Sequence, residues 1–306
     1  MNEHRSELEA LIAAANTVIL GKEHQIRLAL SCLLAGGDLL IEDLPGVGKT
    51  TLAQVLARLC GLQMRRIQFT ADLLPADILG ASVYDREEGT LRFRPGPIFA
   101  QLVLADEVNR ATPKAQSALL EAMEERQVTV EGASYRLPQP FFVIATQNPD
   151  QQIGCFPLPE SQLDRFLMCI GLGYPHAAAE RALLLGENRR RMLQRLEPVL
   201  DPATLRALQE AATEVHTSAA LVDYLQALLQ YTRTGGRFLH GLSPRSGLAL
   251  RRAAQAWALL HGRDHALPED IQAVFSSVAA HRLQPREGAG QAAVDAAAVL
   301  ERVPIP

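Results

Sequence analysis

The sequence predicts an α/β fold in which helices flank a parallel sheet, followed by a helical region. The first observation is three short apolar runs, DLLIE (38–42), QLVLADE (101–107) and FFVIATQ (141–147), whose continuous apolarity is typical of strands buried on both faces. The second is the helical spacing of apolar residues between these runs, because strands alternating with helices indicate a parallel sheet. The third is the helical, alanine- and leucine-rich pattern beyond Tyr174.

Two segments after the strand runs carry the helical signals. Apolar residues recur at helical spacing over 52–59, with Gly61 as a stop, and over 115–123, with Thr112 and Pro113 as the cap and first-turn proline. Each of these segments is therefore predicted to be a helix that packs on the sheet.

Two further segments interrupt the alternation. SVYDREEGTLRFRPG (82–96) and QVTVEGASYRL (127–137) each hold two short β-like stretches around a glycine-containing turn, so both are predicted to be inserted hairpins, with surface loops as the alternative. The character of the chain changes after GLGYP (171–175). We therefore expect an α/β domain over 1–174 and a helical domain over 175–306.

Within the second domain, helix starts are predicted where a capping position precedes a proline. These starts lie at Asp201, Ser243 and Leu267.

Composition excludes several classes of protein. The chain has 306 residues and is 48% apolar, enough for one large domain or two ordinary ones with a substantial core. A net charge of −4 argues against a constitutive nucleic-acid binder. Four cysteines without a C-x-x-C pair favour free thiols over a metal or disulfide framework. The N-terminus lacks the features of a signal peptide, and no run reaches the roughly 20 apolar residues that cross a membrane, so we expect a cytoplasmic protein.

The stretch LLIEDLPGVGKTT (39–51) nearly matches the phosphate-loop pattern G-x-x-x-x-G-K-[ST]. Gly48, Lys49 and Thr50 fit, but Asp43 replaces the first glycine; a side chain is tolerated there if φ stays negative. In such a loop the backbone approaches a phosphate, the lysine reaches the β- and γ-phosphates, and the hydroxyl ligates Mg²⁺. A glycine-rich turn without a ligand is the alternative.

Polar groups also end the other two strand runs. Asp106 is expected to hold the Mg²⁺ shell, and Glu107 to act on an attacking water as general base. Asn148, before Pro149, is expected to orient that water or touch the γ-phosphate. Arg165 and Arg245 suit phosphate recognition because a guanidinium is a planar fork of donors. An acidic turn, an Asn-Pro turn and solvated arginines are the respective alternatives.

Taken together, these stretches resemble the MoxR group of the AAA+ ATPases. The resemblance runs from VILGK (18–22) to LPEDIQAV (267–274), which is most of the chain. It is carried by IEDLPGVGKT, LLPADILG, FRPGPIFA, LADEVNRATPKAQSALLEAMEERQVTVEG, FFVIATQNP, FPLPESQLDRF and SPRSGLAL. It implies the AAA+ fold, a P-loop parallel sheet with inserted hairpins followed by an all-α lid, and it implies ATP hydrolysis with Mg²⁺. Aspartate at position 43 is familiar in this group, so the loop is expected to be competent.

The resemblance also implies a role for each site residue. The catalytic residues it implies are Lys49, Glu107, Asn148 as sensor 1, and Arg165 as the arginine finger that reaches the neighbouring subunit's nucleotide. Residues expected to contact the nucleotide are Ile19, Leu20, Gly21, Asp43, Leu44, Pro45, Gly46, Val47, Gly48, Lys49, Thr50, Thr51, Asp106 and Arg245, the last as sensor 2 from the lid. Thr50 and Asp106 are the expected Mg²⁺ ligands. Lys22 stands where a glutamine is more usual.

The implied assembly is a homo-oligomeric ring, usually of six subunits. Proteins of this group act as chaperone-like remodellers beside proteins with von Willebrand factor A domains, and their inserted hairpins face a central pore and touch clients. Two alternatives stay open: a nucleotide-gated binding module with little turnover, and a DNA-linked motor. The near-neutral charge weighs against the motor, so no nucleic-acid partner is expected.

Overall fold

A computed structural model describes residues 2–86, 89–148, 154–286 and 296–305. Its centre is a five-stranded sheet of order β2–β5–β8–β1–β9, in which every neighbouring pair is parallel. The strands are β1 (Leu39–Glu42), β2 (Met64–Gln68), β5 (Leu102–Asp106), β8 (Phe142–Gln147) and β9 (Met168–Ile170). The predicted α/β class is confirmed, and the three apolar runs form the three central strands.

The two outer strands of this sheet were not predicted. In β2 only Ile67 is buried, as befits an edge strand with one covered face, and β9 is three residues long. Neither strand therefore carries the continuous apolar run that marks a strand covered on both sides.

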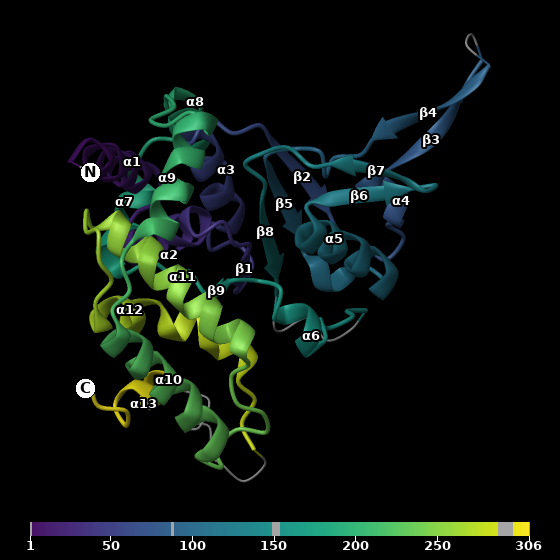
Figure 1. Cartoon of the computed structure of the whole chain (residues 1–306). Coiled ribbons are helices and arrows are strands. Elements are labelled where there is room, and N and C mark those ends of the chain that lie inside the picture. Colours follow the sequence, from purple (N-terminus) through teal and green to yellow (C-terminus); the bar gives the residue numbers. More distant parts are fainter. Residues whose placement is uncertain (1, 87–88, 149–153, 287–295, 306) are drawn as a thin grey trace.

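Alternate residues of the central strands point into different hydrophobic clusters, as strand geometry requires. Leu39, Leu104 and Ile144 join a cluster that contains residues of α1, α2 and α3. Leu40 and Val103 join a second cluster that contains residues of α5. Figure 1 shows α5 on the opposite side of the sheet from α3. The helices of these layers are α1 (Asn2–Val18), α2 (Glu23–Leu34), α3 (Lys49–Leu59) and α5 (Pro113–Glu125).

Both predicted hairpins are present. The first follows α4 (Pro75–Leu79) and consists of β3 (Gly80–Asp85) and β4 (Thr90–Pro95); the second consists of β6 (Gln127–Val130) and β7 (Ala133–Arg136). Residues 87 and 88 of the first turn lie outside the described residues. The β3–β4 hairpin extends away from the body (Figure 1). The Phe93 ring of β4 stacks on Tyr135 of β7 at a centroid distance of 4.1 Å, so the two hairpins are in contact.

The chain after β9 is helical in its described parts, as predicted. Asp201 and Ser243 accept hydrogen bonds from backbone N–H groups in the first turns of their helices, and a proline follows Leu267 at the start of the next. The boundary expected near Tyr174 falls in the segment between β9 and α7. The helices are α7 (Ala177–Leu185), α8 (Arg189–Arg195), α9 (Pro202–Glu214), α10 (Ala219–Thr234), α11 (Pro244–Leu260), α12 (Pro268–Ala279) and α13 (Ala297–Leu300), with a 3₁₀ turn at Ala280–Arg282.

This helical region covers one face of the α/β layers. Helices α9 and α11 pack on α2, and α8 packs on α1 and α3. Buried side chains from both parts meet in the first of the two clusters. No helix in the described ranges is long and apolar enough to cross a membrane. All four cysteines are free thiols in the structure, which agrees with the prediction.

The 3₁₀ turn after α12 anchors the helical region to the segment that leads into β9. The Arg282 guanidinium binds the Asp164 carboxylate, with Nε 2.6 Å from Oδ1, and also donates to the Phe166 carbonyl at 2.6 Å. Its neighbour His281 places Nε2 3.3 Å from the same carbonyl. Burial, aided by the charge of Arg282, lowers the pKa of His281 to about 3.

The buried His281 predicts an acid-labile junction. The pKa of histidine is near 6.5 in the unfolded state and about 3 in the native state. Between these pH values His281 is therefore protonated in the unfolded state and neutral in the native state. Stability is therefore lost as pH falls from 6.5. This residue alone should remove about 2 kcal/mol of unfolding free energy between pH 7 and pH 5. Urea denaturation of wild type and His281→Gln across this range measures the effect; parallel pH curves would show that His281 does not titrate as described.

Candidate functional site

The segment between β1 and α3 forms an open loop at the edge of the sheet. Gly46 and Gly48 adopt φ values of 84° and 103°, which glycine tolerates and side-chain-bearing residues rarely do. A Cβ atom at either position would meet no atom within 4 Å, so the loop backbone faces open space. Helix α3 begins directly after it, at Lys49. Its free N–H groups and positive dipole end make this place suited to an anion.

The Lys49 side chain lies at the tips of the central strands and is only 8% exposed. Its ammonium donates to the Asp43 carbonyl at 2.5 Å, to the Gln147 carbonyl at 3.2 Å and to the Asn148 side-chain oxygen. Burial lowers the pKa of Lys49, and nearby carboxylates, Asp43 first, oppose that shift. The ammonium is thus held beside the loop by neutral oxygen acceptors, which phosphate oxygens can replace.

Asp106 ends β5 and is 7% exposed. Its Oδ1 accepts a hydrogen bond of 2.5 Å from the Thr146 hydroxyl, and its Oδ2 accepts from Arg66 Nε and Nη2 at 3.0 and 2.6 Å. Arg66 comes from the edge strand β2. The carboxylate is thereby fixed between two neighbouring strands.

Glu107 leaves the strand in the left-handed region, with φ 57° and ψ 51°. Its N–H donates to the Thr146 hydroxyl at 2.9 Å, which secures this uncommon backbone. Its carboxylate accepts from Asn148 Nδ2 at 3.2 Å and from Gln68 Nε2 and Arg110 Nη1, each at 3.0 Å. Because the backbone turns here, Glu107 borders the same cavity as Asp106.

A cavity of about 320 Å³ unites these groups. They come from the loop, from the tip of β5 and from the residue after β8. That last residue, Asn148, is held in place by Asn109, whose Nδ2 donates to the Asn148 carbonyl at 3.3 Å. Pro149, expected to restrain Asn148, lies outside the described residues. The lining residues are Pro45, Gly46, Gly48, Lys49, Thr50, Thr51, Asp106, Glu107 and Asn148.

A second cavity, of about 460 Å³, adjoins the first and shares Pro45, Gly46, Gly48 and Thr51 with it. Most of its other side chains are apolar, which suits a planar ring such as a nucleobase. The residues found only in this cavity are Val18, Ile19, Leu20, Lys22, Val47, Tyr174, Pro175, Glu180, Leu183, Leu184 and Arg189.

Four residues expected to contact the nucleotide do not line either cavity: Arg245, described below, and Gly21, Asp43 and Leu44. Gly21 has φ 69° and packs against His176, where a Cβ would come within 2.8 Å of the ring. Asp43 and Leu44 lie at the base of the loop, where the Leu44 N–H donates to the Asp43 carboxylate at 2.8 Å. Lys22 donates from Nζ to the Tyr174 carbonyl at 2.7 Å, so it binds the protein itself.

The residues present fit a magnesium ion. The Thr50 hydroxyl and Asp106 carboxylate face one cavity and supply the oxygen donors that this ion prefers. Within the described ranges, no group of three or more His, Cys, Asp or Glu side chains is placed to hold a metal. A bound Mg²⁺ would therefore complete its shell with water and phosphate oxygens, as it commonly does.

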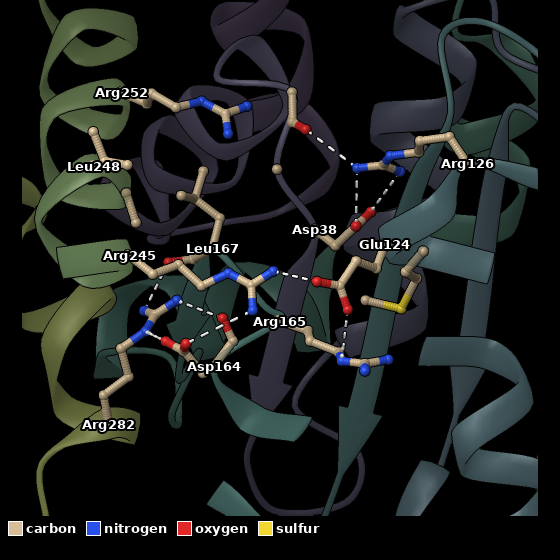
Figure 2. Close-up of a pocket in the computed structure, with 14 residues that line it drawn as sticks. Asp38, Glu124, Arg126, Asp164, Arg165, Leu167, Arg245, Leu248, Arg252 and Arg282 are labelled. Atoms are coloured by element: carbon tan, nitrogen blue, oxygen red, sulfur yellow. Dashed lines mark hydrogen bonds and ion pairs between the residues drawn. The ribbon is translucent and has the colours of Figure 1, made fainter. Parts of the chain in front are cut away.

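Arg165 and Arg245 lie together, and neither lines the two cavities above. Both bind the carboxylate of Glu124 on α5: Arg165 Nε is 3.1 Å from Oε2, and Arg245 Nη2 is 2.5 Å from Oε1 (Figure 2). The bond to Arg245 is the main cause of the lowered pKa of Glu124. The helical region thus places Arg245, which was expected to contact the nucleotide, in a pocket separate from the phosphate loop of its own chain.

That pocket, of about 430 Å³, is rich in arginine. Five guanidiniums face three carboxylates in it, which leaves an excess of positive charge that attracts anions. Figure 2 shows Arg126 paired with Asp38 on one side and Arg282 with Asp164 on the other. The arginines are Arg126, Arg165, Arg245, Arg252 and Arg282, and the acidic residues are Asp38, Glu124 and Asp164.

Several residues of these sites were not predicted. Arg66 and Gln68 lie on the polar edge strand, and Thr146 lies inside an apolar run, so none carried a signal of its own. Glu124 stands in an acidic helix end, where a charged side chain is usually solvated. The contacts that define their roles all join residues distant in sequence.

Comparisons with known proteins agree with this geometry. Residues 38–168 match the ATPase family associated with various cellular activities, and residues 230–303 match the AAA lid domain. The chain is 42% identical to YeaC of Bacillus subtilis, over 98% of this chain and 95% of that protein. It is 39% identical to chaperone MoxR1 of Mycobacterium tuberculosis, over 90% of this chain and 75% of that protein.

Among solved structures, that of a protein assigned as an ATPase from Cytophaga hutchinsonii is similar at a TM-score of 0.89 and 34% identity. It covers 99% of this chain and 96% of its own. Sequence relatives that span nearly the whole chain, the two matched family models and the shared fold lead to one conclusion. This chain belongs to the MoxR family of AAA+ ATPases.

Proposed function

We propose that this chain binds ATP in the two adjoining cavities and hydrolyses it at the strand tips. The observation that carries the proposal is the convergence of Lys49, Thr50, Asp106, Glu107 and Asn148 around one cavity beside a helix N-terminus. An ammonium, a hydroxyl, two carboxylates and a carboxamide are the groups that phosphoryl transfer to water requires. The apolar cavity next to them takes the base.

The chain's own groups divide the chemical work. The loop N–H groups and Lys49 bind the phosphates, and Lys49 exchanges its present acceptors for phosphate oxygens. Glu107 accepts the proton of the attacking water, a contribution of roughly 10²–10⁴ in rate. Asn148, which already donates to Glu107, keeps that carboxylate aimed at the water. When bound at Thr50 and Asp106, Mg²⁺ neutralises charge on the β- and γ-phosphates.

The arginine pair points to a site shared between chains. Arg165 and Arg245 are held by Glu124 in a pocket of their own, so they are available to a neighbouring molecule rather than to their own loop. In a head-to-tail ring each chain would lend this pair to the next chain's triphosphate. An arginine supplied in this way raises turnover by roughly 10³–10⁵ in other nucleotidases. A six-membered ring is the form we expect.

The work done by this hydrolysis is proposed to be the remodelling of a protein partner. One relative is named a chaperone. The projecting β3–β4 hairpin carries apolar side chains that are exposed in the single chain, namely Val83, Tyr84 and Leu91, which a client segment can contact. A protein with a von Willebrand factor A domain is the partner we expect to present the client.

One observation favours a second candidate, a nucleotide-gated binding module with little turnover. The Glu107 carboxylate is engaged by three donors, and Asp106 is paired with Arg66. If these contacts persist after ATP binds, the general base stays unavailable. Steady-state phosphate release measured across protein concentration separates the two: a rate per chain that rises with concentration supports the shared hydrolytic site, and a flat, near-zero rate supports the module.

Two substitutions separate binding from hydrolysis. Lys49→Ala should weaken ATP binding by at least tenfold because it removes the cation that meets the phosphates. Glu107→Gln should bind ATP like wild type but lose at least 100-fold in turnover, since the amide cannot accept the proton. Calorimetric titration and phosphate release measure the two effects. Wild-type affinity in Lys49→Ala, or full turnover in Glu107→Gln, would contradict the assigned roles.

Mixed assemblies test the shared site. Arg165→Ala and Glu107→Gln chains should each be inactive alone. In a 1:1 mixture, roughly a quarter of the interfaces pair an intact catalytic cavity with an intact arginine, as random head-to-tail assembly requires. ATP hydrolysis should recover toward that fraction of the wild-type rate. Absence of recovery at every ratio, with mixed assembly verified by a tag, would rule out an arginine acting between chains.

Thr146 provides a test of how the two carboxylates are positioned. Its hydroxyl accepts from the Glu107 N–H and donates to Asp106, and the residue is fully buried. Thr146→Val keeps the shape but leaves both partners unsatisfied, so turnover should fall at least tenfold and stability by about 1–3 kcal/mol. Thr146→Ser retains the hydroxyl and should recover most of the turnover. Equal turnover in the valine and serine variants would show that the hydroxyl does not position the carboxylates.

A further inference from the structure

Asp43 stands where phosphate loops usually carry glycine, and the structure explains why glycine is unnecessary. Within the described ranges, the non-glycine residues with positive φ are Glu107, Arg126 and Glu131. Asp43 is not among them, so its backbone conformation does not require glycine. The position is free to carry a side chain, and its carboxylate makes contacts within the loop and beyond it.

The polar groups of Asp43 make contacts in three directions. Its N–H donates to the Gln147 carbonyl of β8 at 3.2 Å, and its carbonyl accepts from Lys49 at 2.5 Å. Its Oδ1 accepts the Leu44 N–H at 2.8 Å, while Oδ2 accepts the N–H groups of both Leu172 and Gly173 at 2.5 Å. One residue thus joins the sheet, the lysine of the loop and the segment that follows β9.

The segment held by Asp43 leads directly into one wall of the apolar cavity. Tyr174 and Pro175 line that cavity, as do Glu180, Leu183 and Leu184 of α7, and the loop residues Pro45 to Gly48 line it as well.

Packing holds the outer part of this wall, helix α7, only weakly. In α7 only Ala179 is buried, and Leu184 is 83% exposed. The main polar tie of the wall besides Asp43 is the bond from Lys22 to the Tyr174 carbonyl. The base of the wall is fixed by the buried side chain of Leu172 and by the hydrogen bonds that Leu172 and Gly173 make to Asp43.

We propose that Asp43 is a positioning residue for the nucleobase. Its carboxylate holds residues 172–173 against the first residue of the loop, and this sets the width of the apolar cavity in which the base lies. The carboxylate accepts hydrogen bonds from three backbone N–H groups, those of Leu44, Leu172 and Gly173, and it acts on Lys49 through its charge. The assignment rests on the proposed function, since it concerns the same ATP site.

The test compares a ligand that has a base with one that lacks it. Asp43→Gly restores the usual loop glycine and removes the carboxylate. We expect its Kd for ATP to rise about tenfold, while its Kd for inorganic tripolyphosphate stays within about twofold of wild type. Both are measured by calorimetric titration with Mg²⁺. The KM for ATP should rise by the same factor with kcat at saturation retained, because the strand-tip groups are unchanged.

Two further variants separate this role from a loss of stability. Asp201→Gly removes another aspartate that accepts a backbone N–H, that of Thr204 at 2.7 Å, and it should change neither Kd. Asp43→Asn keeps one acceptor oxygen; its ATP affinity should lie between wild type and glycine, and the amides of Leu172 and Gly173 should exchange with deuterium faster than in wild type. This variant keeps the proposal testable if Asp43→Gly folds poorly.

Three outcomes would overturn the proposal. Equal weakening of ATP and tripolyphosphate would place the effect of Asp43 on the loop itself. Unchanged binding of both ligands in the glycine and asparagine variants would leave the carboxylate without a role in the site. A wild-type chain that binds neither ligand would overturn the proposed ATP site, and this assignment with it. Where wild type binds both ligands, either of the first two outcomes overturns this assignment alone.

Discussion

A run of hydrogen bonds across the tips of three adjacent parallel strands is the interaction on which this protein's site depends. Lys49 donates to Asn148, Asn148 donates to Glu107, the Glu107 N–H donates to Thr146, and Thr146 donates to Asp106. Every donor in the run has its acceptor, so the charged groups stay in place although they are largely removed from water. The run exists because the carboxyl ends of parallel strands lie at one edge of a sheet.

The arginine pocket is built by a different constraint, the docking of the helical region. Arg245 reaches Glu124 only because α11 packs on α2, and Arg282 secures the same region to the segment around Asp164. Glu124 lies in the last turn of α5, and Arg126, with φ 53°, turns the chain from that helix into the β6–β7 hairpin. The arginine pair, α5 and the two stacked hairpins are therefore connected by direct contacts from one side of the molecule to the other.

Long apolar runs and glycine-containing turns made much of the fold predictable. The central strands, both hairpins and the helix starts after Asp201 and Ser243 each carry a local signal that tertiary structure preserves. The edge strand β2 is half polar and β9 is three residues long, so local pattern could not distinguish them from loops. The grouping of Lys49, Asp106, Glu107 and Asn148 was predictable because strand tips meet in any parallel sheet. Arg66, Thr146 and Glu124 were not, because their roles exist only through partners on other elements.

By itself, the sequence determined the class of the fold, the phosphate-loop pattern and the polar groups at the strand tips, since these follow from patterns within a few residues. Tertiary structure alone decided where Arg245 goes, a contact with a residue 121 positions away, and what Asp43 holds, a segment about 130 positions away. The physical reason is the same for both. The partner of such a side chain is set by how the layers pack against each other, and a pattern within a few residues does not predict a partner more than 100 positions away.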